Sequence, residues 1–190
     1  VEGEDVEMLG EGNIAEIAQV YSVAGSQAVA LNASDDINWM PVGVVAAKSK
    51  ATDVSISLNS KMLSQMNNEG GKLFIYDATT KKFTEIADGM KVQMMANDHG
   101  RYYITNNNWV VPTGISAVHC FSPSPSTIIV AALNGEVKRV VVYDIAGSLV
   151  TSNHSSIGER CQLNVQQPGV YIVKATTKED QTETFKIVVK

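Results

Sequence analysis

The side chains of this chain best suited to covalent chemistry are two thiols and three imidazoles. His119 and Cys120 adjoin in sequence, and a thiol activated by a histidine is a nucleophile. Neighbouring residues of a strand point to opposite faces, so on a strand this thiol and this imidazole cannot meet. His99 falls in a turn and His154 in a polar loop, where we expect both to be solvated. The motifs HExxH, GxSxG, GxxxxGK[ST] and GxGxxG do not occur. We therefore predict no catalytic residue and no enzymatic activity.

Two loop clusters carry oxygen atoms that could bind a calcium ion. They are Asp35 and Asp36 with Asn32 and Asn38, and Asp98 with Asn97. Neither cluster has the ligand spacing of an EF-hand, and loop carboxylates are usually solvated. We therefore predict no metal site and no cofactor. The acidic start of the chain, Val1–Glu7, is expected to be a solvated segment.

The two cysteines leave two alternatives open. Cys120 and Cys161 lie far apart in sequence and fit no CxxC or zinc-ligand spacing. In an exported protein they could form a disulfide, and two separate buried thiols fit the sequence equally well.

Composition excludes several classes of protein. The chain is 44% hydrophobic and carries a net charge of −5, with its basic residues scattered, which argues against a nucleic-acid partner. The longest apolar run, Ile128–Leu133, is strand-sized and far short of the ~20 residues of a membrane-spanning helix. The sequence begins without Met or a signal-peptide pattern, so we expect it to be part of a longer protein whose export signal lies upstream.

Period-two patterns predict strands through the first half of the chain. Polar and apolar residues alternate strictly in Asp53–Leu58, which predicts a strand with one buried and one wet face. The segment Ser60–Asn67 is the helical candidate, with Ser60 as its cap and one or two turns in length. Further strands are expected at Ile14–Val23, Ala28–Leu31, Pro41–Ala47, Leu73–Asp77, Phe83–Ile86, Lys91–Met95 and Arg101–Thr105, with hairpins joining the first two and Leu73–Asp77 to Phe83–Ile86.

A change in composition divides the chain. The run Asn106–Asn108 and the prolines that follow it predict a linker, with room for a short strand inside it. We therefore expect an N-terminal β-sandwich-like module at residues 1–110, a linker at 111–126 and a C-terminal domain at 127–190.

The last segment repeats the strand pattern in shorter units. Thr127–Ala132 and Val137–Ile145 flank Asn134–Gly135, a type I′ turn signal. Further strands are expected at Leu149–Thr151, Cys161–Val165, Val170–Ala175 and Thr184–Lys190. Six or seven strands in so few residues predict a small Ig-like sandwich, and the whole chain is predicted to be all-β with two β-sandwich-like domains.

The stretches VKRVVVYDIAGSLV, QLNVQQPGVYIVKA and FKIVVK carry a family resemblance. In this order they are similar to the type A C-terminal sorting domain of the type IX (Por) secretion system. The match covers about Thr127–Lys190, and the family's first strand usually follows an Asn-Pro turn, where this chain reads SPSPS. The residues that fit the family pattern, and so the candidates for recognition of the sorting signal, are Tyr143, Asp144, Gly147, Gly169, Val170, Tyr171, Lys186, Val188, Val189 and Lys190.

The resemblance implies a role in export. It implies translocation across the outer membrane of a Gram-negative bacterium and then surface display or release, with the secretion translocon as partner and no chemistry in the domain itself. The part before it is similar, more weakly, to β-rich modules that precede such domains in large surface proteins. A terminal strand is also a suitable recognition element, because a partner can bind an extended strand edge by β-augmentation.

Two alternatives to this interpretation stay open, one for the roles of single residues and one for the function of the chain. Gly147 and Gly169 could be ordinary turn glycines, and Tyr143 and Tyr171 ordinary core residues. The chain could also be an adhesive or carbohydrate-binding module whose C-terminal domain is a spacer and whose partner is a glycan. An exposed row of aromatic residues would favour that function, and the chain has two tryptophans, Trp39 and Trp109.

Overall fold

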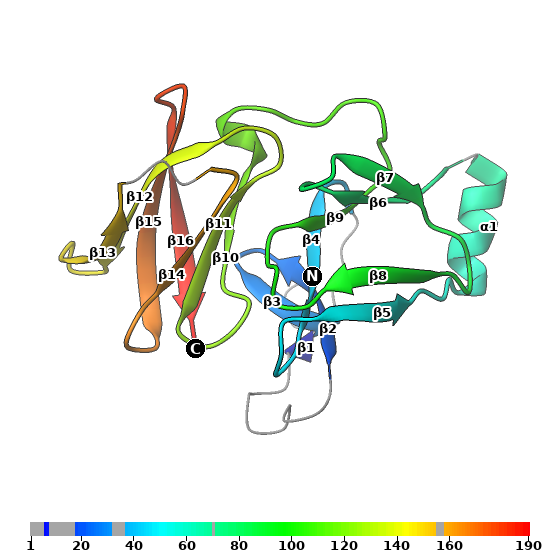
Figure 1. Cartoon of the computed structure of the whole chain (residues 1–190), viewed down its shortest axis with the longest axis horizontal. Helices are drawn as coiled ribbons and strands as arrows, with labels where there is room; N and C mark the ends of the chain where they lie inside the picture. Colours follow the sequence, from blue (N-terminus) through cyan, green and yellow to red (C-terminus); the bar gives the residue numbers. More distant parts are fainter. Residues whose placement is uncertain (1–5, 8–17, 32–36, 70, 155–157) are drawn as a thin grey trace.

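The computed structural model describes residues 6–7, 18–31, 37–69, 71–154 and 158–190. Strands dominate these residues, as the alternating sequence patterns predict. They form an N-terminal region that ends with β9 (Tyr102–Thr105) and a C-terminal region that begins with β10 (Val118–Phe121), lying side by side (Figure 1). No helix among the described residues is long and apolar enough to cross a membrane.

A seven-stranded antiparallel sheet frames the N-terminal region. Its strands follow the order β1-β3-β2-β4-β9-β6-β7, and a second sheet pairs β5 with β8. The bounds are β1 (Val6–Glu7), β2 (Gln19–Ala24), β3 (Gln27–Leu31), β4 (Met40–Val45), β5 (Ala51–Ser55), β6 (Phe74–Asp77), β7 (Lys82–Glu85) and β8 (Lys91–Met95). Both predicted hairpins, β2–β3 and β6–β7, are present.

Three sequence predictions in this region fall wholly or partly on residues outside the described ranges. The strand predicted at Ile14–Val23 is seen as β2, while residues 14–17 lie outside them. The loop at residues 32–36, with the calcium candidates Asp35 and Asp36, also lies outside, as does most of the acidic start.

Apolar side chains fill the space between the two sheets of the N-terminal region. The buried set includes Val44, Ile75 and Met94, and the alternating residues Val54 and Ile56 pack against it. The predicted alternation of burial is therefore confirmed, although β5 ends at Ser55 and its inward residues are half-buried, since its own sheet has only two strands.

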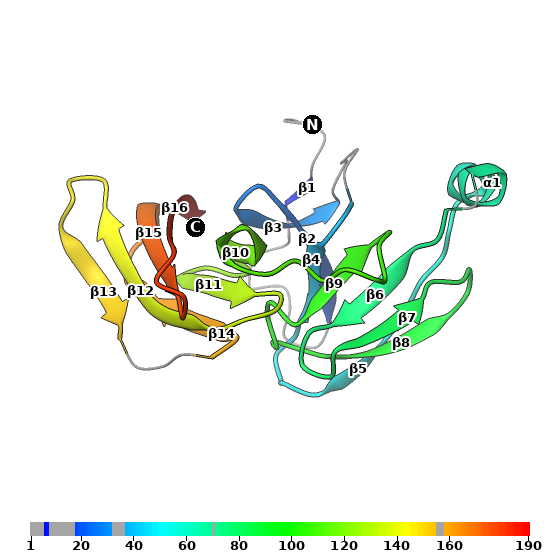
Figure 2. The ribbon, with the colours of Figure 1, turned by 90° about the horizontal axis from the view of Figure 1, so that it is seen from above.

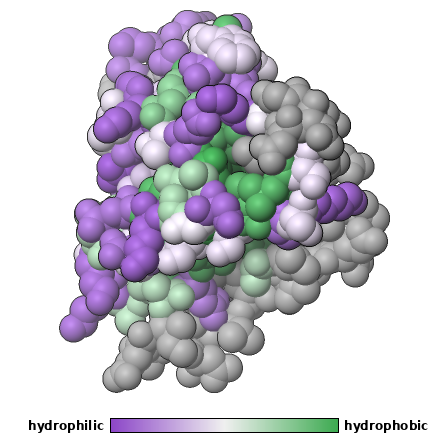
Figure 3. All heavy atoms as spheres, turned by 90° about the vertical axis from the view of Figure 1, so that its right-hand side faces the viewer, coloured by the Kyte–Doolittle hydropathy of each residue, from purple (hydrophilic) through white to green (hydrophobic). Residues whose placement is uncertain are grey.

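Helix α1 (Ser60–Glu69) is longer than the one or two turns predicted, at 10 residues. The cap is Asn59, not Ser60: the Asn59 Oδ1 atom accepts the Met62 N–H at 2.9 Å, and the Asn59 carbonyl accepts the Leu63 N–H. Met62 packs against the apolar set described above, which stabilises a helix too short to persist alone. Seen from the α1 end, hydrophobic residues gather at the centre with hydrophilic residues around them (Figure 3).

Seven strands in two stacked sheets form the C-terminal region (Figure 2). The sheet orders are β10-β11-β14 and β13-β12-β15-β16. Their shared core contains fully buried residues such as Val130, Val140, Val173 and Ile187. The bounds are β11 (Thr127–Ala132), β12 (Val137–Asp144), β13 (Leu149–Asn153), β14 (Arg160–Asn164), β15 (Gly169–Thr177) and β16 (Thr182–Val189). The predicted sandwich of about seven strands is confirmed.

The segment Asn134–Gly135 does not close the hairpin that its sequence predicts. β11 pairs with β10 and β14, whereas β12 pairs with β13 and β15, so the turn carries the chain from one sheet to the other. Gly135 has φ +136°, and Asn134 is not in a positive-φ conformation, whereas a type I′ turn needs positive φ at both residues.

The two cysteines are separate buried thiols. Cys120 pairs with Val130 of β11, and Val130 pairs with Cys161 on its other side. Two strand spacings separate the cysteine Cα atoms by about 9–10 Å, beyond the reach of about 7 Å for a disulfide. Both thiols lie in the C-terminal core, and burial raises the pKa of each.

The two regions share buried contacts. Tyr21 packs with Phe121, Ile129 and Ala131 of the C-terminal region. A second cluster joins Trp39, Tyr76 and Tyr103 to Ala117 and Leu133. Every residue of β11 is consequently buried, which explains why its sequence is apolar without alternation.

Hydrogen bonds and ion pairs complete this contact. The Ala28 N–H donates to the Ser122 carbonyl, and the Ser122 N–H donates to the Ser26 carbonyl, at 3.1 and 2.9 Å. The Asp98 carboxylate of the N-terminal region forms ion pairs with one arginine from each region. Its oxygens lie 3.1 Å from a guanidinium nitrogen of Arg101 and 2.7 Å from one of Arg160. The residues from 111 to 126, predicted as a linker, thus contain β10 and a short 3-10 turn, Ile115–Ala117, and touch both regions.

Candidate functional site

The outer face of the sheet β13-β12-β15-β16 is the surface on which the family-pattern residues gather. Alternate residues of these strands point inward to the core, among them Val142, Tyr171 and Ile187. The residues between them point outward, away from the core. We call this outer face the open face, defined by Tyr143, Leu149, Val170, Ile172, Lys174, Lys186 and Val188.

Strand register aligns the open face in rows. Leu149, Tyr143, Ile172 and Lys186 are successive cross-strand partners across all four strands. Lys174 lies in the neighbouring row, and its Nζ atom sits 5.7 Å from the centre of the Tyr143 ring. Directly paired side chains are close enough to present one continuous surface.

The open face combines apolar surface with positive charge. Lys174 and Lys186 are exposed on it, and Arg139 lies at one end, since its partner Thr176 belongs to the same outward set. The outward positions of the described strands β12, β15 and β16 hold no carboxylate, although the whole chain has a net charge of −5. Exposed apolar residues continue into the β12–β13 turn, where Ile145 is 80% and Leu149 63% exposed. Such a surface suits a partner that is apolar and acidic.

Some of the predicted recognition residues have structural roles. Tyr171 is buried in the core, and its hydroxyl donates to the Gln167 carbonyl at 2.5 Å. Val189 is likewise a core residue. Asp144 braces the β12–β13 turn, because its Oδ1 atom accepts the Ser148 N–H at 2.8 Å, and Gly147 occupies that turn at φ +83°.

The remaining predicted residues are presented to solvent or lie at the sheet end. Tyr143 and Val170 are half-buried on the open face, and Lys186 and Val188 are exposed there. Lys190 is exposed, and its carbonyl accepts the Ser126 N–H at 3.3 Å. Gly169 is not at positive φ, and a Cβ added there would meet only the Tyr171 ring at 3.9 Å.

Sequence reasoning missed three members of the open face. Ile172, Lys174 and Leu149 were not among the predicted recognition residues, although the register places them beside Tyr143 and Lys186. Period-two alternation within Val170–Ala175 could have assigned Ile172 and Lys174 to the face of Val170. Leu149 pairs with Tyr143 because of a bulge between Val142 and Tyr143, and no sequence pattern predicts this bulge.

The histidine and thiol candidates do not form a reactive centre. Cys120 faces the C-terminal core, and His119 faces the other way, with its ring 5.3 Å from that of Tyr103, as the strand alternation predicts. His99 is not solvated as predicted. It is half-buried, and its Nδ1 atom lies 2.9 Å from the Tyr21 hydroxyl. Burial lowers the pKa of His99 and of His119 to about 4. His154 is exposed, as predicted.

The calcium candidate at Asn97 and Asp98 is occupied by protein groups. Asn97 bonds through its amide to both the N–H and the carbonyl of Ala46. Asp98 is not the solvated carboxylate predicted, because its two oxygens receive Arg101 and Arg160. The described residues contain no group of three or more potential metal-ligating side chains.

Comparison with known proteins identifies the C-terminal region. Residues 122–190 match the family described as a secretion system C-terminal sorting domain, of the Por type. No curated protein matches the chain. A solved structure titled "Biofilm associated protein - BSP domain" is similar over 90% of this chain, with 14% identity and a TM-score of 0.35. The chain spans 29% of the length of that protein.

The family match fixes the role of this region at a coarse level. A domain of this family is a non-catalytic targeting signal, which implies export through a secretion system of Gram-negative bacteria, an interaction with that machinery, and secretion or surface display. The match begins after β10, so the strand Val118–Phe121 completes the three-stranded sheet from outside the matched residues.

Proposed function

We propose that the C-terminal region directs translocation of its protein across the outer membrane, through contacts of the secretion translocon with the open face. The family match supports the export role. The observation that supports the surface is the outward row Leu149–Tyr143–Ile172–Lys186, which draws on both the VYDIAG and the GVYIV stretches as well as the last strand.

The other surfaces of the domain are less suited to a translocon. Both inner sheet faces form the core, and the outer face of β10-β11-β14 contacts the N-terminal region through Phe121, Ile129 and Ala131. The open face is the outer face of this domain that combines exposed apolar residues with exposed lysines. Strand β16, which carries Lys186 and Val188 of this face, is an end strand of its sheet, and an end strand can accept a partner's strand by β-augmentation.

A secretion assay tests the export role. The whole chain is attached behind a reporter in a Gram-negative host with this secretion system, and the fraction of reporter outside the cell is measured. We expect removal of residues 186–190, the end of β16, to retain the reporter in the periplasm. A matched truncation that removes residues 1–5 serves as control and leaves export unchanged. Undiminished export without residues 186–190 contradicts the proposal.

Adhesion is a second candidate function, and it concerns the N-terminal region. Trp109 favours it, since this side chain is 77% exposed whereas Trp39 is 7% exposed. No exposed row of aromatic residues runs across a described sheet face, so the support for adhesion comes from the surroundings of Trp109 alone. Export and adhesion are compatible, because surface display is what an adhesive module requires.

A further inference from the structure

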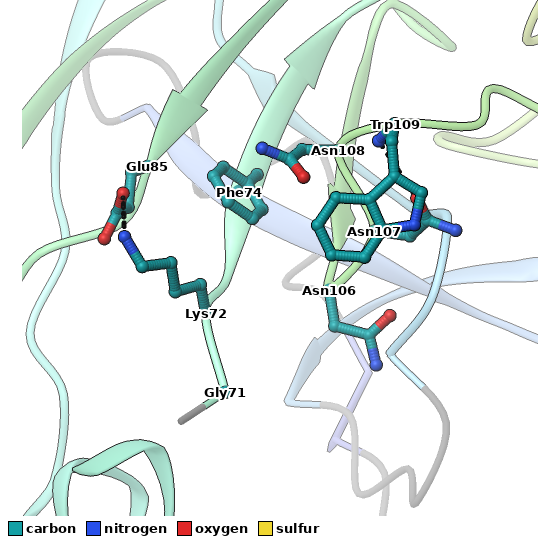
Figure 4. Close-up of a pocket in the computed structure, with 8 residues that line it drawn as sticks. All are labelled: Gly71, Lys72, Phe74, Glu85, Asn106, Asn107, Asn108 and Trp109. Carbon is teal, nitrogen blue, oxygen red and sulfur yellow. Dashed lines mark hydrogen bonds and ion pairs between the residues drawn. The ribbon is translucent and has the colours of Figure 1, made fainter. Parts of the chain in front are cut away.

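A hollow of about 570 Å³ lies beside Trp109, at the end of the N-terminal region. Its lining includes Lys72, Phe74, Glu85, Asn106, Asn108 and Trp109, which come from β6 and the residues just before it, from β7, and from the segment after β9 (Figure 4). The Trp109 ring stands at one side, and the Asn108 amide lies between it and the Phe74 ring (Figure 4). The volume is within the range of small-molecule sites.

The backbone that presents Trp109 is fixed by hydrogen bonds. The Asn107 Oδ1 atom accepts the N–H groups of Trp109 and Val110 at 3.1 and 3.2 Å. The Asn107 N–H in turn donates to the Thr105 hydroxyl, and Thr105 is fully buried and donates to Asn38. An exposed indole held on an ordered turn is a preformed platform, because little entropy is lost when a ligand stacks on it.

Polar groups of the hollow point to a ligand that can both donate and accept hydrogen bonds. Asn106 lines the hollow and is exposed, so its side-chain amide can donate hydrogen bonds to a ligand and accept them from it. The Asn108 Oδ1 atom also belongs to the lining but is shielded from solvent, so it is not offered to a ligand in this arrangement.

The charges of the hollow disfavour an anionic ligand. Lys72 and Glu85 form an ion pair at 2.9 Å, so the lysine is already neutralised and its partner repels anions. A purely apolar ligand would take the exposed Asn106 amide out of water without giving it a hydrogen-bond partner. A pyranose ring satisfies both requirements, since one face carries C–H groups and its rim carries hydroxyls.

We propose that this hollow binds a neutral saccharide, with one pyranose face stacked on Trp109 and a hydroxyl hydrogen-bonded to the exposed Asn106 amide. The inference deepens the adhesive candidate function and is independent of the export role. The site is open and carries one aromatic platform, so a dissociation constant of roughly 0.1–1 mM for an oligosaccharide is expected.

Tryptophan fluorescence of the purified chain gives the first test. Acrylamide quenches Trp109 and not the buried Trp39, so the accessible fraction of the emission reports on this site alone. The probes are soluble hexasaccharides of glucose, mannose, galactose or N-acetylglucosamine, with a galacturonate hexamer and a proline-rich peptide for comparison. At least one neutral hexasaccharide should protect Trp109 from quenching. The proposal is overturned if none does, or if the galacturonate hexamer or the peptide protects better.

Calorimetric titration of variants with the protecting hexasaccharide gives the second test. Trp109→Ala should weaken binding at least tenfold and Asn106→Ala severalfold. The matched control is Val110→Ala, a neighbouring residue that is 60% exposed and not part of the lining, and it should leave the affinity unchanged. Binding that survives Trp109→Ala contradicts the site. Export is not measured here, so failure of this test and failure of the sorting role are distinguished.

Discussion

The two outer faces of the C-terminal domain differ in burial although the two sheets share one core. The face of β10-β11-β14 is covered by the N-terminal region, and all six residues of β11 are buried. The outer face of β13-β12-β15-β16 keeps exposed side chains such as Leu149, Lys174 and Lys186, and β16 alternates between exposed and buried at residues 186–189. Figure 2 shows the three-stranded sheet between the other sheet and the N-terminal region.

This difference assigns separate tasks to the two faces. A strand buried on both sides contributes to stability through either face, and a substitution there acts on folding. A strand buried on one side leaves its outward residues free for recognition, so substitutions there can change binding without unfolding the domain. Stability and export should therefore respond to different halves of the same domain.

Truncation of Phe121 should have the largest effect on stability. This side chain is fully buried between the two regions, so Phe121→Ala should lower the free energy of unfolding by about 3–5 kcal/mol. Leu149→Ala on the open face should change it by less than about 0.5 kcal/mol, since Leu149 is 63% exposed. Urea unfolding measures both. If both variants lose the same free energy of unfolding, the two outer faces do not differ in their contribution to stability.

Two glycines at positive φ provide the next comparison. A Cβ at Gly100 would lie 2.6 Å from the Ala131 Cβ atom of β11, and its φ is +75°. Gly100→Ala should thus destabilise by about 3 kcal/mol through strain and overlap. Gly147→Ala meets no atom within 4 Å and carries the strain alone, about 1 kcal/mol. Similar unfolding midpoints for the two variants would show that the regions do not approach closely at Gly100.

Acid should weaken the covered face before the open one. Burial lowers the pKa of His99 and His119 to about 4, whereas both titrate near 6.5 in the unfolded chain. Their contribution is complete above about pH 6.5 and is lost as the pH falls toward 4, roughly 3 kcal/mol for each histidine. The nearby Asp98 opposes the shift of His99, while burial alone acts on His119.

Unfolding measured across this pH range checks the effect. His119→Leu should flatten the dependence of stability on pH between 6.5 and 4. His154→Gln, at an exposed histidine, is the control and should leave the dependence as it is. An unchanged slope in His119→Leu would mean that this imidazole is not held neutral in the folded chain.

Local pattern predicted most strands of this fold, and it failed where distant contacts decide. Alternation in Asp53–Leu58 located β5, which spans Ala51–Ser55, and the apolar run at Thr127–Ala132 identified a buried strand. The sequence of β11 could not show that the N-terminal region covers its outer face. A strand buried on both faces is apolar throughout, whichever part of the chain covers each face. The turn signal at Asn134–Gly135 was overridden by the pairing of β11 and β12 with different partners.

The candidate sites show the same limit. The family pattern located Tyr143 and Lys186, and the register then added Ile172 and Lys174 to their face. Nothing in the sequence distinguished Trp109 from Trp39, since exposure of an indole depends on the turn made by Asn107 and on its neighbours in space.

Export of a charge-reversed open face tests the central claim most directly. Lys174→Glu with Lys186→Glu reverses the open face, and Lys138→Glu with Lys178→Glu makes the same charge change at exposed ion pairs with Asp180 and Glu136. Surface ion pairs contribute little, so both double variants should keep the unfolding midpoint of the parent chain. In the reporter assay, we predict that the open-face variant loses at least tenfold in exported fraction and that the matched variant stays within twofold. Equal export of the two variants would contradict recognition through the open face.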